Sequence, residues 1–395
     1  MFRTVRIKDI AQIKSGKRLP KGDDLVTTPT THPYIRGRDI KNGRITFNAP
    51  VYLSEKTFEK IKRYTVNAGD VCVTIVGNIG DVGEVPVFLD KANLTENAVK
   101  LVNLSHKCDR LFLKYSLLRR EAQHQMKSYA AGAAQPKLGI YKLNEIEILL
   151  PGIAEQKKIV AILSQYDDLV ENNTRRIQIL DETAQRIYRE WFVNFRFPGH
   201  AKVKFIDSAM GKVPAGWMVK RLGDVLELAY GKALKSEDRK NGDVPVYGSS
   251  GIIGYHNRRL VDGPGIIVGR KGNVGSVFWS DTNFFPIDTV FYVLTELNLS
   301  YIYYHLQSMN FINNDAAVPG LNRNQAYSLP CLVPEKGILD SFQGIIMPIL
   351  NHRRLLSLKN DNLRNTWETL LPRLLSGDVV ISEKDIAMRE QVDGT

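Results

Sequence analysis

Apolar side chains recur at alternating spacings of three and four residues across the stretch 153–197. The positions of this first seam are Ile159, Leu163, Tyr166, Val170, Asn173, Ile177, Leu180, Ala184, Ile187 and Trp191. Such a repeat is typical of a helix that buries one stripe in a coiled coil. A second seam lies 183 positions further along, at Phe342, Ile346, Ile349, Arg353, Leu356, Asn360, Leu363, Trp367, Leu370 and Leu374. The sequence therefore predicts two long helices whose seams have the same phase.

Two matching helices in one chain can pair with each other in antiparallel orientation. The residues expected to pair are Leu163, Tyr166, Val170, Asn173, Ile177 and Leu180 with Leu356, Asn360, Leu363 and Trp367. Placing Asn173 opposite Asn360 can fix the register, as one buried polar residue does in coiled coils, or it can mark two solvated positions at a loose spot. Gly344, Pro348 and Pro372 lie in the second helical pattern, where proline removes a backbone donor. We therefore expect the second helix to be the less regular one.

Each predicted helix follows a segment with strand-like patterns and glycine turns. The stretch VRIKDIAQIKSGKRL at 5–19 returns as KRLGDVLELAYGKAL at 220–234. GNIGDVGEV at 77–85 returns as GRKGNVGSV at 269–277, each after an apolar β-branched run, as in a strand, turn and strand. The expected fold class is α+β, with two mainly β domains alternating with two long helices that pair as an antiparallel coiled coil in a pseudo-twofold internal repeat.

The expected boundaries follow from these patterns. They are a first β domain at 1–150, a first helix at 151–197, a linker at 198–216, a second β domain at 217–334, a second helix at 335–377 and a polar tail at 378–395. Asp109 and Asn298 are candidate N-caps of one helical segment in each domain. The first domain carries a longer tract around 31–64 than the second has at its place. Related domains with different surfaces are expected to recognise different things.

Charge and cysteine content narrow the class of protein. Lys and Arg outnumber Asp and Glu by 54 to 42, giving a net charge of +12 and a pI near 9.4. This favours a polyanionic partner but also describes many plain basic proteins. Cys72, Cys108 and Cys331 are far apart and suggest neither a disulfide framework nor a zinc ribbon. Without an apolar run of membrane or signal-peptide type, we expect a cytoplasmic protein.

The sequence lacks the motifs of several enzyme classes. It contains no G-x-x-x-x-G-K-[ST] phosphate loop, and no Pro-Pro dipeptide of the kind that adenine methyltransferases need. Its seven histidines have no metal-ligand spacing. Asp9 and Asp224 occupy matching positions in the repeat, and we expect them to cap local turns. No catalytic residue, metal ligand or bound cofactor is therefore assigned to this chain.

Basic and amide side chains in the loops suit contact with DNA. Lys and Arg neutralise phosphates, and Arg, Asn and Gln can make paired hydrogen bonds to base edges. The candidates are Lys17, Arg18, Arg36, Arg38, Asn78, Gln135 and Lys137 in the first domain, and Lys232, Asn257, Arg258, Arg270, Lys271, Asn273, Asn322, Arg323 and Asn324 in the second. A solvated surface role is the alternative for each. Two unlike domains on one spacer predict a bipartite, asymmetric target whose halves lie roughly 34 Å apart.

Several segments together resemble one family. They are YIRGRDIKNGRI, GRKGNVGSVFWSDTNFFPIDTVF, LPGIAEQKKIVAIL, REWFVNFRFPG and LLPRLLSGDV. Over nearly its whole length the chain resembles the specificity subunit of type I restriction-modification enzymes. Arg353 and Asn360 depart from the apolar seam in the second helix, and the diversity of the family's recognition domains lets no base contact be carried over.

The resemblance implies a recognition subunit that is not itself an enzyme. Two target-recognition domains would bind double-stranded DNA, and the helices would serve as a spacer and as the docking site for two methyltransferase subunits. Those subunits use S-adenosylmethionine to methylate adenine, and two restriction subunits use ATP and Mg for translocation and cleavage. Two alternatives stay open. One is a coiled-coil scaffold that holds two protein-binding β domains, and the other is a self-sufficient, metal-dependent nuclease.

Overall fold

The structure is a computed structural model that describes residues 2–131, 136–311 and 320–379. The chain divides into two compact units, Met1–Glu171 with Asp361–Thr395, and Asn172–Asn360. Each unit contains one β domain and part of both long helices, α6 (Ile153–Tyr188) and α9 (Lys336–Ser376). The division between the two units therefore falls inside both helices. The boundaries predicted from the sequence, in contrast, treat each helix as a separate segment of the chain.

The β domain of the first unit is built on one mixed sheet. Its strand order is β2 (Gln12–Ser15), β9 (Ala98–Val102), β6 (Val71–Thr74), β7 (Val82–Glu84), β5 (Gly43–Ile45) and β4 (Ile40–Lys41). Two strand pairs accompany it, β1 (Arg3–Arg6) with β10 (Glu147–Leu150) and β3 (Tyr34–Ile35) with β8 (Asn93–Leu94). The helical segments are α1 (Ile7–Ile10), η1 (Gly37–Asp39), α2 (Glu55–Ile61), η2 (Lys62–Tyr64), η3 (Val87–Leu89), α3 (Arg110–Leu118), α4 (Arg120–Ala130) and α5 (Ile140–Asn144).

The β domain of the second unit has a four-stranded and a three-stranded sheet. The first has the order β14 (Glu227–Tyr230), β20 (Val290–Leu294), β17 (Gly265–Gly269) and β18 (Val277–Ser280). The second has the order β16 (Gly251–His256), β15 (Val244–Gly248) and β19 (Phe285–Pro286). Two further pairs are β11 (Phe205–Ser208) with β12 (Gly211–Pro214) and β13 (Met218–Arg221) with β21 (Pro330–Val333). The helical segments are η4 (Arg189–Val193), η5 (His200–Lys202), η6 (Leu222–Asp224), η7 (Ser236–Asp238), α7 (Leu299–Ser308) and α8 (Arg323–Ser328).

The two β domains share one plan. Strands β2, β9, β6 and β7 of the first correspond in order to β14, β20, β17 and β18 of the second. The pair β1 with β10 corresponds to β13 with β21, and the parallel pair β3 with β8 corresponds to β15 with β19. The longer tract of the first domain adds β4, β5 and α2. The α+β fold and the internal repeat predicted from the sequence are therefore confirmed.

Asp9 and Asp224, at equivalent positions of the repeat, accept equivalent backbone hydrogen bonds. The backbone N–H of Arg6 donates to the Asp9 carboxylate at 3.1 Å, and that of Arg221 donates to Asp224 at 3.2 Å. Both aspartates thus cap local turns, as expected. Asp109 and Asn298 cap α3 and α7, and both predictions are confirmed.

Three local expectations differ from the structure. The segment after Asp109 forms two helices because Arg119 adopts an extended conformation between α3 and α4. The predicted linker contains the hairpin of β11 and β12. Helix α9 continues without a break through Pro348, where Ile346 and Leu350 are buried on either side. Tertiary packing of an apolar face supplies most of a helix's stability and here outweighs the missing hydrogen bond.

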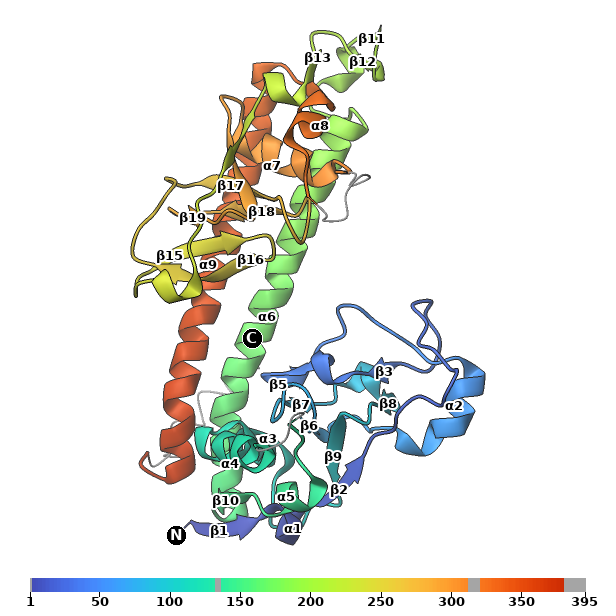
Figure 1. Ribbon diagram of the computed structural model, residues 1–395, viewed down its shortest axis with the longest axis vertical. Helices are drawn as coiled ribbons and strands as arrows, with labels where there is room; N and C mark the ends of the chain where they lie inside the picture. Colours follow the sequence, from blue (N-terminus) through green and yellow to red (C-terminus); the bar gives the residue numbers. More distant parts are fainter. Residues whose placement is uncertain (1, 132–135, 312–319, 380–395) are drawn as a thin grey trace. The chain divides into compact units, whose positions relative to one another are not determined.

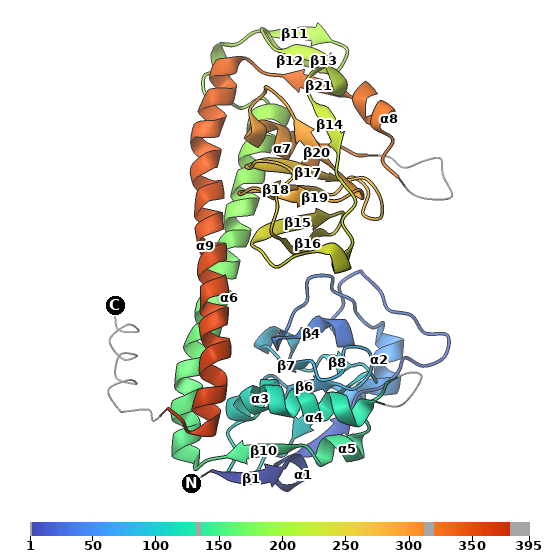
Figure 2. The same cartoon turned by 60° about the vertical axis from the view of Figure 1, so that its left-hand side comes forward.

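Helices α6 and α9 lie side by side (Figures 1 and 2). In the second unit Asn173 contacts Asn360, and Asp181 forms an ion pair with Arg353 at 3.1 Å. Residue numbers rise along one helix as they fall along the other, so the pair is antiparallel. Every position of the two predicted seams is buried or partly buried.

Each β domain is fixed to its own part of the helix pair. In the first unit, the core includes Ile159 and Leu163 of α6 and Leu371, Leu374 and Leu375 of α9. A polar contact adds to it, because the buried Lys114 lies 3.3 Å from Asp167 of α6 and the Tyr115 hydroxyl donates to the same carboxylate at 2.9 Å. Burial raises the pKa of the Tyr115 hydroxyl, and the neighbouring Asp167 charge adds to the effect.

The second unit uses an aromatic core for the same purpose. The Phe192 ring, just after α6, lies 4.8 Å from the Phe342 ring of α9 and 4.8 Å from the Tyr301 ring of α7. Arg353 of α9 extends the contact into the domain through Asp281, 4.0 Å away. Each β domain, with the loops at its strand ends, is therefore packed firmly against the helices.

Candidate nucleic-acid interface

Six of the predicted residues of the second domain lie together at one end of its four-stranded sheet, where β14 and β17 end and β20 begins. The chain leaves β14 at Tyr230 and β17 at Gly269, and both strand ends border the start of β20. The backbone N–H groups of Arg270 and Lys271 donate to the Thr289 carbonyl, and the N–H of Leu321 donates to the Arg270 carbonyl at 2.8 Å. These bonds hold the start of α8 against the same end of the sheet. The residues assembled are Lys232, Arg270, Lys271, Asn322, Arg323 and Asn324.

Asn322 acts first as a structural cap. Its side-chain oxygen accepts from the backbone N–H groups of Asn324 at 3.0 Å and of Gln325 at 3.2 Å. This satisfies donors that the first turn of α8 leaves without a partner. Because Asn322 caps α8, it fixes the backbone position from which the Arg323 side chain extends.

The remaining candidates of the second domain lie elsewhere. Asn257 and Arg258 follow β16, in the three-stranded sheet, and both are exposed. The side-chain amide of Asn273 donates to the Ser250 hydroxyl at 3.2 Å, which ties the turn between β17 and β18 to the turn after β15. The structure thus separates the predicted set into one cluster and two outlying loops.

In the first domain, Lys17 and Arg18 follow β2 as Lys232 follows β14. The Lys17 backbone N–H donates to the Leu94 carbonyl at 2.9 Å, and its ammonium group lies 5.5 Å from the centre of the Tyr64 ring. The exposed Arg18 pairs with Glu96 at 2.8 Å. The pKa of Glu96 is lowered: its partial burial opposes ionisation, but the hydrogen bond from Arg18 and further bonds outweigh it.

Arg36 and Arg38 have different roles although they are two residues apart. Arg36 donates from Nε and Nη2 to both oxygens of Asp39, at 2.9 and 2.8 Å, and also donates to the Ala49 carbonyl. Its side chain is only 15% exposed. Arg36 therefore braces its own loop, whereas the exposed Arg38 presents its guanidinium to solvent.

An open groove of about 650 Å³ lies beside Asn78. Lys41 and Lys127 also line it, and so does Asp81. Partial burial raises the pKa of Asp81, while the charges of the two lysines act against that rise. Lys137 lies close by, since it bridges to Val76 on the strand side of the turn. Gln135 lies outside the described residues.

Lys41 and Lys127 were missed by sequence reasoning. Lys41 stands three residues after Arg38 in the tract YIRGRDIKNGRI but is not among the candidates, and Lys127 lies on an ordinary helical pattern. Only the fold brings both side chains to the groove of Asn78, because they are far apart in the chain. No local signal marks either residue.

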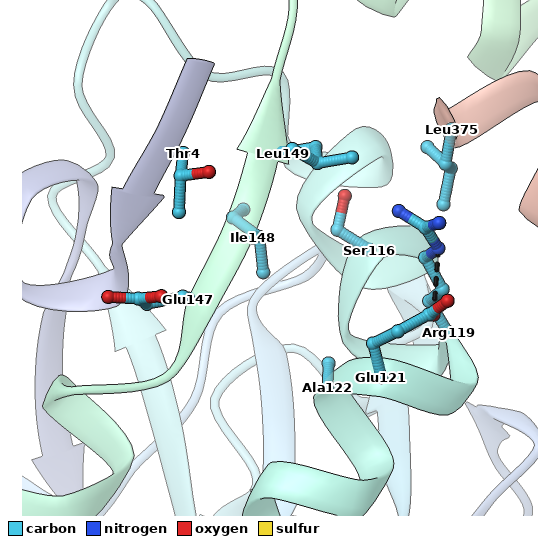
Figure 3. A pocket seen from close by; sticks show the side chains of 9 residues that line it. All are labelled: Thr4, Ser116, Arg119, Glu121, Ala122, Glu147, Ile148, Leu149 and Leu375. Atoms are coloured by element: carbon cyan, nitrogen blue, oxygen red, sulfur yellow. Dashed lines mark ion pairs between the residues drawn. The ribbon is translucent and has the colours of Figure 1, made fainter. Parts of the chain in front are cut away.

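A second hollow, of about 230 Å³, lies beside α3 and α4 (Figure 3). Its lining is Thr4, Ser116, Arg119, Glu121, Ala122, Glu147, Ile148, Leu149 and Leu375. Arg119 forms an ion pair with Glu121 at 2.8 Å, and the third charged residue of the lining, Glu147, lies 3.5 Å from Arg6. None of the predicted DNA-binding residues lines this hollow.

The described residues contain no cluster of His, Cys, Asp and Glu with metal-binding geometry. Cys72, Cys108 and Cys331 are buried as free thiols. Among the helices that the structure describes, none combines the length and apolar character that crossing a bilayer requires.

The family follows from a comparison with known proteins. The model of the type I restriction modification DNA specificity domain matches residues 2–182 and 214–351. The chain belongs to this family. The first range covers a β domain with most of α6, and the second covers a β domain with the first part of α9. The chain is thus the DNA specificity subunit of a type I restriction-modification system, and the specificity subunit is the non-catalytic component.

Relatives match this chain at low sequence identity. The MjaIX specificity subunit of Methanocaldococcus jannaschii is 24% identical, over 96% of this chain and 93% of the relative. The HindI specificity subunit of Haemophilus influenzae is 22% identical, over 68% of this chain and 77% of the relative. The crystal structure of the S subunit from M. genitalium superposes on this specificity subunit with a TM-score of 0.56 at 18% identity and 97% coverage of both chains. At that identity the likeness shows the fold.

Proposed function

We propose that this specificity subunit recognises an asymmetric, bipartite sequence in double-stranded DNA, with one half-site for each β domain. The observation that carries the proposal is the repeat itself. The two domains share a strand order, yet equivalent strands end in different side chains: β2 ends at Ser15 before Gly16-Lys17, and β14 ends at Tyr230 before Gly231-Lys232. A common scaffold with different loops is suited to recognising two different short sequences.

The contact residues are proposed from position and chemistry. In the first domain we assign Lys17, Arg18, Arg38, Asn78 and Lys137 to DNA, joined by Lys41 and Lys127 of the groove. In the second we assign Lys232, Arg270, Lys271, Arg323 and Asn324, with Asn257, Arg258 and Asn273 in flanking loops. Arg36 and Asn322 have a structural role instead: Arg36 bonds to Asp39 in its own loop, and Asn322 caps the first turn of α8. Basic groups supply affinity through phosphates, and the paired donors of Arg and Asn supply discrimination.

The partners in this proposal are the other subunits of the system. The paired helices dock two methyltransferase subunits, which use S-adenosylmethionine to methylate adenine. Two restriction subunits with ATP and Mg complete the cleaving form. This chain binds none of these cofactors itself and acts in the cytoplasm, where the DNA is.

The test is binding of the specificity subunit, assembled with its methyltransferase, to duplex DNA over a range of salt concentrations. A contact set of six to ten phosphates predicts a loss of about 10³ to 10⁵ in affinity between 50 and 200 mM salt. One bipartite sequence should be bound about 10³-fold or more above random duplex. A scaffold for protein partners would show neither property, and a nuclease would cut DNA as an isolated chain with metal.

A further inference from the structure

Two arginines lie against three aromatic rings where β14 and β17 end in the second domain. The guanidinium carbon of Arg270 lies 4.9 Å from the centre of the Tyr230 ring and 5.8 Å from that of Phe291. The guanidinium carbon of Arg323 lies 5.0 Å from the Tyr230 ring and 5.8 Å from that of Tyr327. Tyr230, whose ring also contacts Phe291, therefore links Phe291 and Arg270 to Arg323 and Tyr327, and we call these five side chains the stacked ladder. Tyr230 is the only member that contacts both arginines.

Both ends of the stacked ladder are anchored in the domain. Phe291 is 1% exposed on β20, and its ring lies 5.0 Å from that of Tyr230. The Tyr327 hydroxyl accepts from the backbone N–H of Leu228 at 2.9 Å. Arg270 donates from Nη1 to the Asp288 carbonyl at 2.9 Å. The middle of the ladder, in contrast, faces outward, since Tyr230 is 50% exposed.

Each guanidinium carries several N–H donors at its edge, of which Arg270 uses Nη1 for the bond to the Asp288 carbonyl. Stacking on a ring uses the flat face of the group, whereas hydrogen bonds leave from its edge. An edge with several N–H donors matches the O6 and N7 acceptors of guanine, or a phosphate. Because stacking limits the rotamers of both arginines, less conformational entropy is lost when DNA is bound.

Tyr230, which lies in the repeated segment 220–234 but is not one of the predicted contact residues, is therefore the residue that connects the two arginines. We propose that Tyr230 is a positioning residue that holds the Arg270 and Arg323 guanidinium groups for contact with the second half-site of the DNA target. The proposal rests on the proposed function and adds a specific residue to it. Tyr230 acts through the arginines and not through its own hydroxyl.

The test uses the full chain assembled with its methyltransferase, and the duplex that carries the bipartite sequence found for the wild type. Tyr230→Leu removes the ring face, and Tyr230→Phe keeps it. We expect Tyr230→Leu to lower affinity for this duplex roughly tenfold, as expected for lost cation–π contacts that position base-reading groups, and Tyr230→Phe to remain within about twofold of wild type. Tyr141→Leu, which removes an exposed tyrosine of the first domain, serves as the matched control and should leave affinity unchanged.

A double-mutant cycle separates positioning from general stability. In an Arg270→Ala and Arg323→Ala background, adding Tyr230→Leu should cost nothing further, because the groups that the ring positions are gone. Affinity for random duplex, and thermal unfolding of the complex, should be equal for Tyr230→Phe and Tyr230→Leu to within the scatter of the control.

Three outcomes would overturn the inference. They are wild-type affinity in Tyr230→Leu, an equal loss in Tyr230→Phe, or a full further loss in the double-arginine background. If the wild-type complex itself showed no sequence preference, the proposed function would fall instead, so the two failures can be told apart.

Discussion

The side-chain amide of Asn173 on α6 donates a hydrogen bond of 2.9 Å to the amide oxygen of Asn360 on α9. Both residues are buried, at 9% and 3% exposure, and Asn360 also donates to Thr174 at 3.3 Å. Two polar residues at one level of an apolar seam satisfy each other only when the helices are in this register. The two asparagines are therefore not solvated positions at a loose spot. Their contact supports a role in fixing the register of the helices.

The asparagine pair gives a stability prediction. Asn360→Leu leaves the Asn173 amide buried without its partner and should lower the free energy of unfolding by about 1–3 kcal/mol. The double variant Asn173→Leu with Asn360→Leu should recover most of that loss, because two apolar residues replace a satisfied polar pair. Urea unfolding of the three proteins measures both effects. Equal stability of the single variant and the wild type would show that the contact contributes nothing.

The repeated glycines give a second prediction. A Cβ atom at Gly16 would overlap the Thr95 carbonyl oxygen, and one at Gly231 would overlap the Ile287 carbonyl oxygen. Alanine at either site should destabilise its domain by about 1–3 kcal/mol, since backbone must move. Gly344→Ala is the matched control: its Cβ would meet nothing within 4 Å, and helix propensity predicts a gain of up to about 1 kcal/mol. Thermal unfolding of the three variants should rank them in this way, and a mild effect at Gly16 and Gly231 would contradict the account.

His305 predicts a pH dependence of stability. Burial lowers its pKa to about 4 from an ordinary 6.5. Between these two pKa values the unfolded chain binds more protons than the folded one, so the free energy of unfolding rises with pH from about 4 to 6.5. The stabilising contribution of neutral His305 is fully present above pH 6.5. The contribution lost on acidification to pH 4 is up to about 3 kcal/mol.

The variant His305→Phe isolates this effect. It keeps a ring against Tyr301 and removes the titrating group, so its unfolding free energy should fall less steeply than that of the wild type between pH 6.5 and 4. His124→Phe, at an exposed site on α4, should leave the wild-type slope. If His305→Phe showed the wild-type pH profile, this explanation would be wrong.

The antiparallel helices predict how the target changes when they are shortened. Residues 170–176 and 357–363 stand opposite each other in the register of Asn173 and Asn360. Deleting both heptads removes about 10 Å of helix, or about three base pairs of duplex. Mapping of methylated adenines should show a gap between half-sites that is shorter by that amount, with the same bases recognised. An unchanged gap would show that the helices do not set it.

The fold was predictable where its signal is local or repeated. The seams follow from spacing within each helix, and the contact of Asn173 with Asn360 lies where two matching seams meet in antiparallel order. Gly16 and Gly231 could be matched because the chain carries the same segment twice.

What could not be predicted depends on contacts between distant segments. Tyr230 meets Arg323 only because α8 is tied to the end of β17. Arg36 and Arg38 look equivalent in the sequence, yet the turn of Asp39 engages one and leaves the other exposed. The continuity of α9 through Pro348 likewise depends on burial of its neighbours.

The central claim is that two unlike domains of one chain each recognise one half of a DNA sequence. Its most direct test is sequencing for methylated adenine in cells that carry this chain with its methyltransferase, before and after residues 217–335 are replaced by those of another family member. The account predicts a bipartite, asymmetric target in which the exchange alters one half-site and leaves the other half-site and the gap unchanged. A change in both half-sites, or a target with a single continuous sequence, would contradict it.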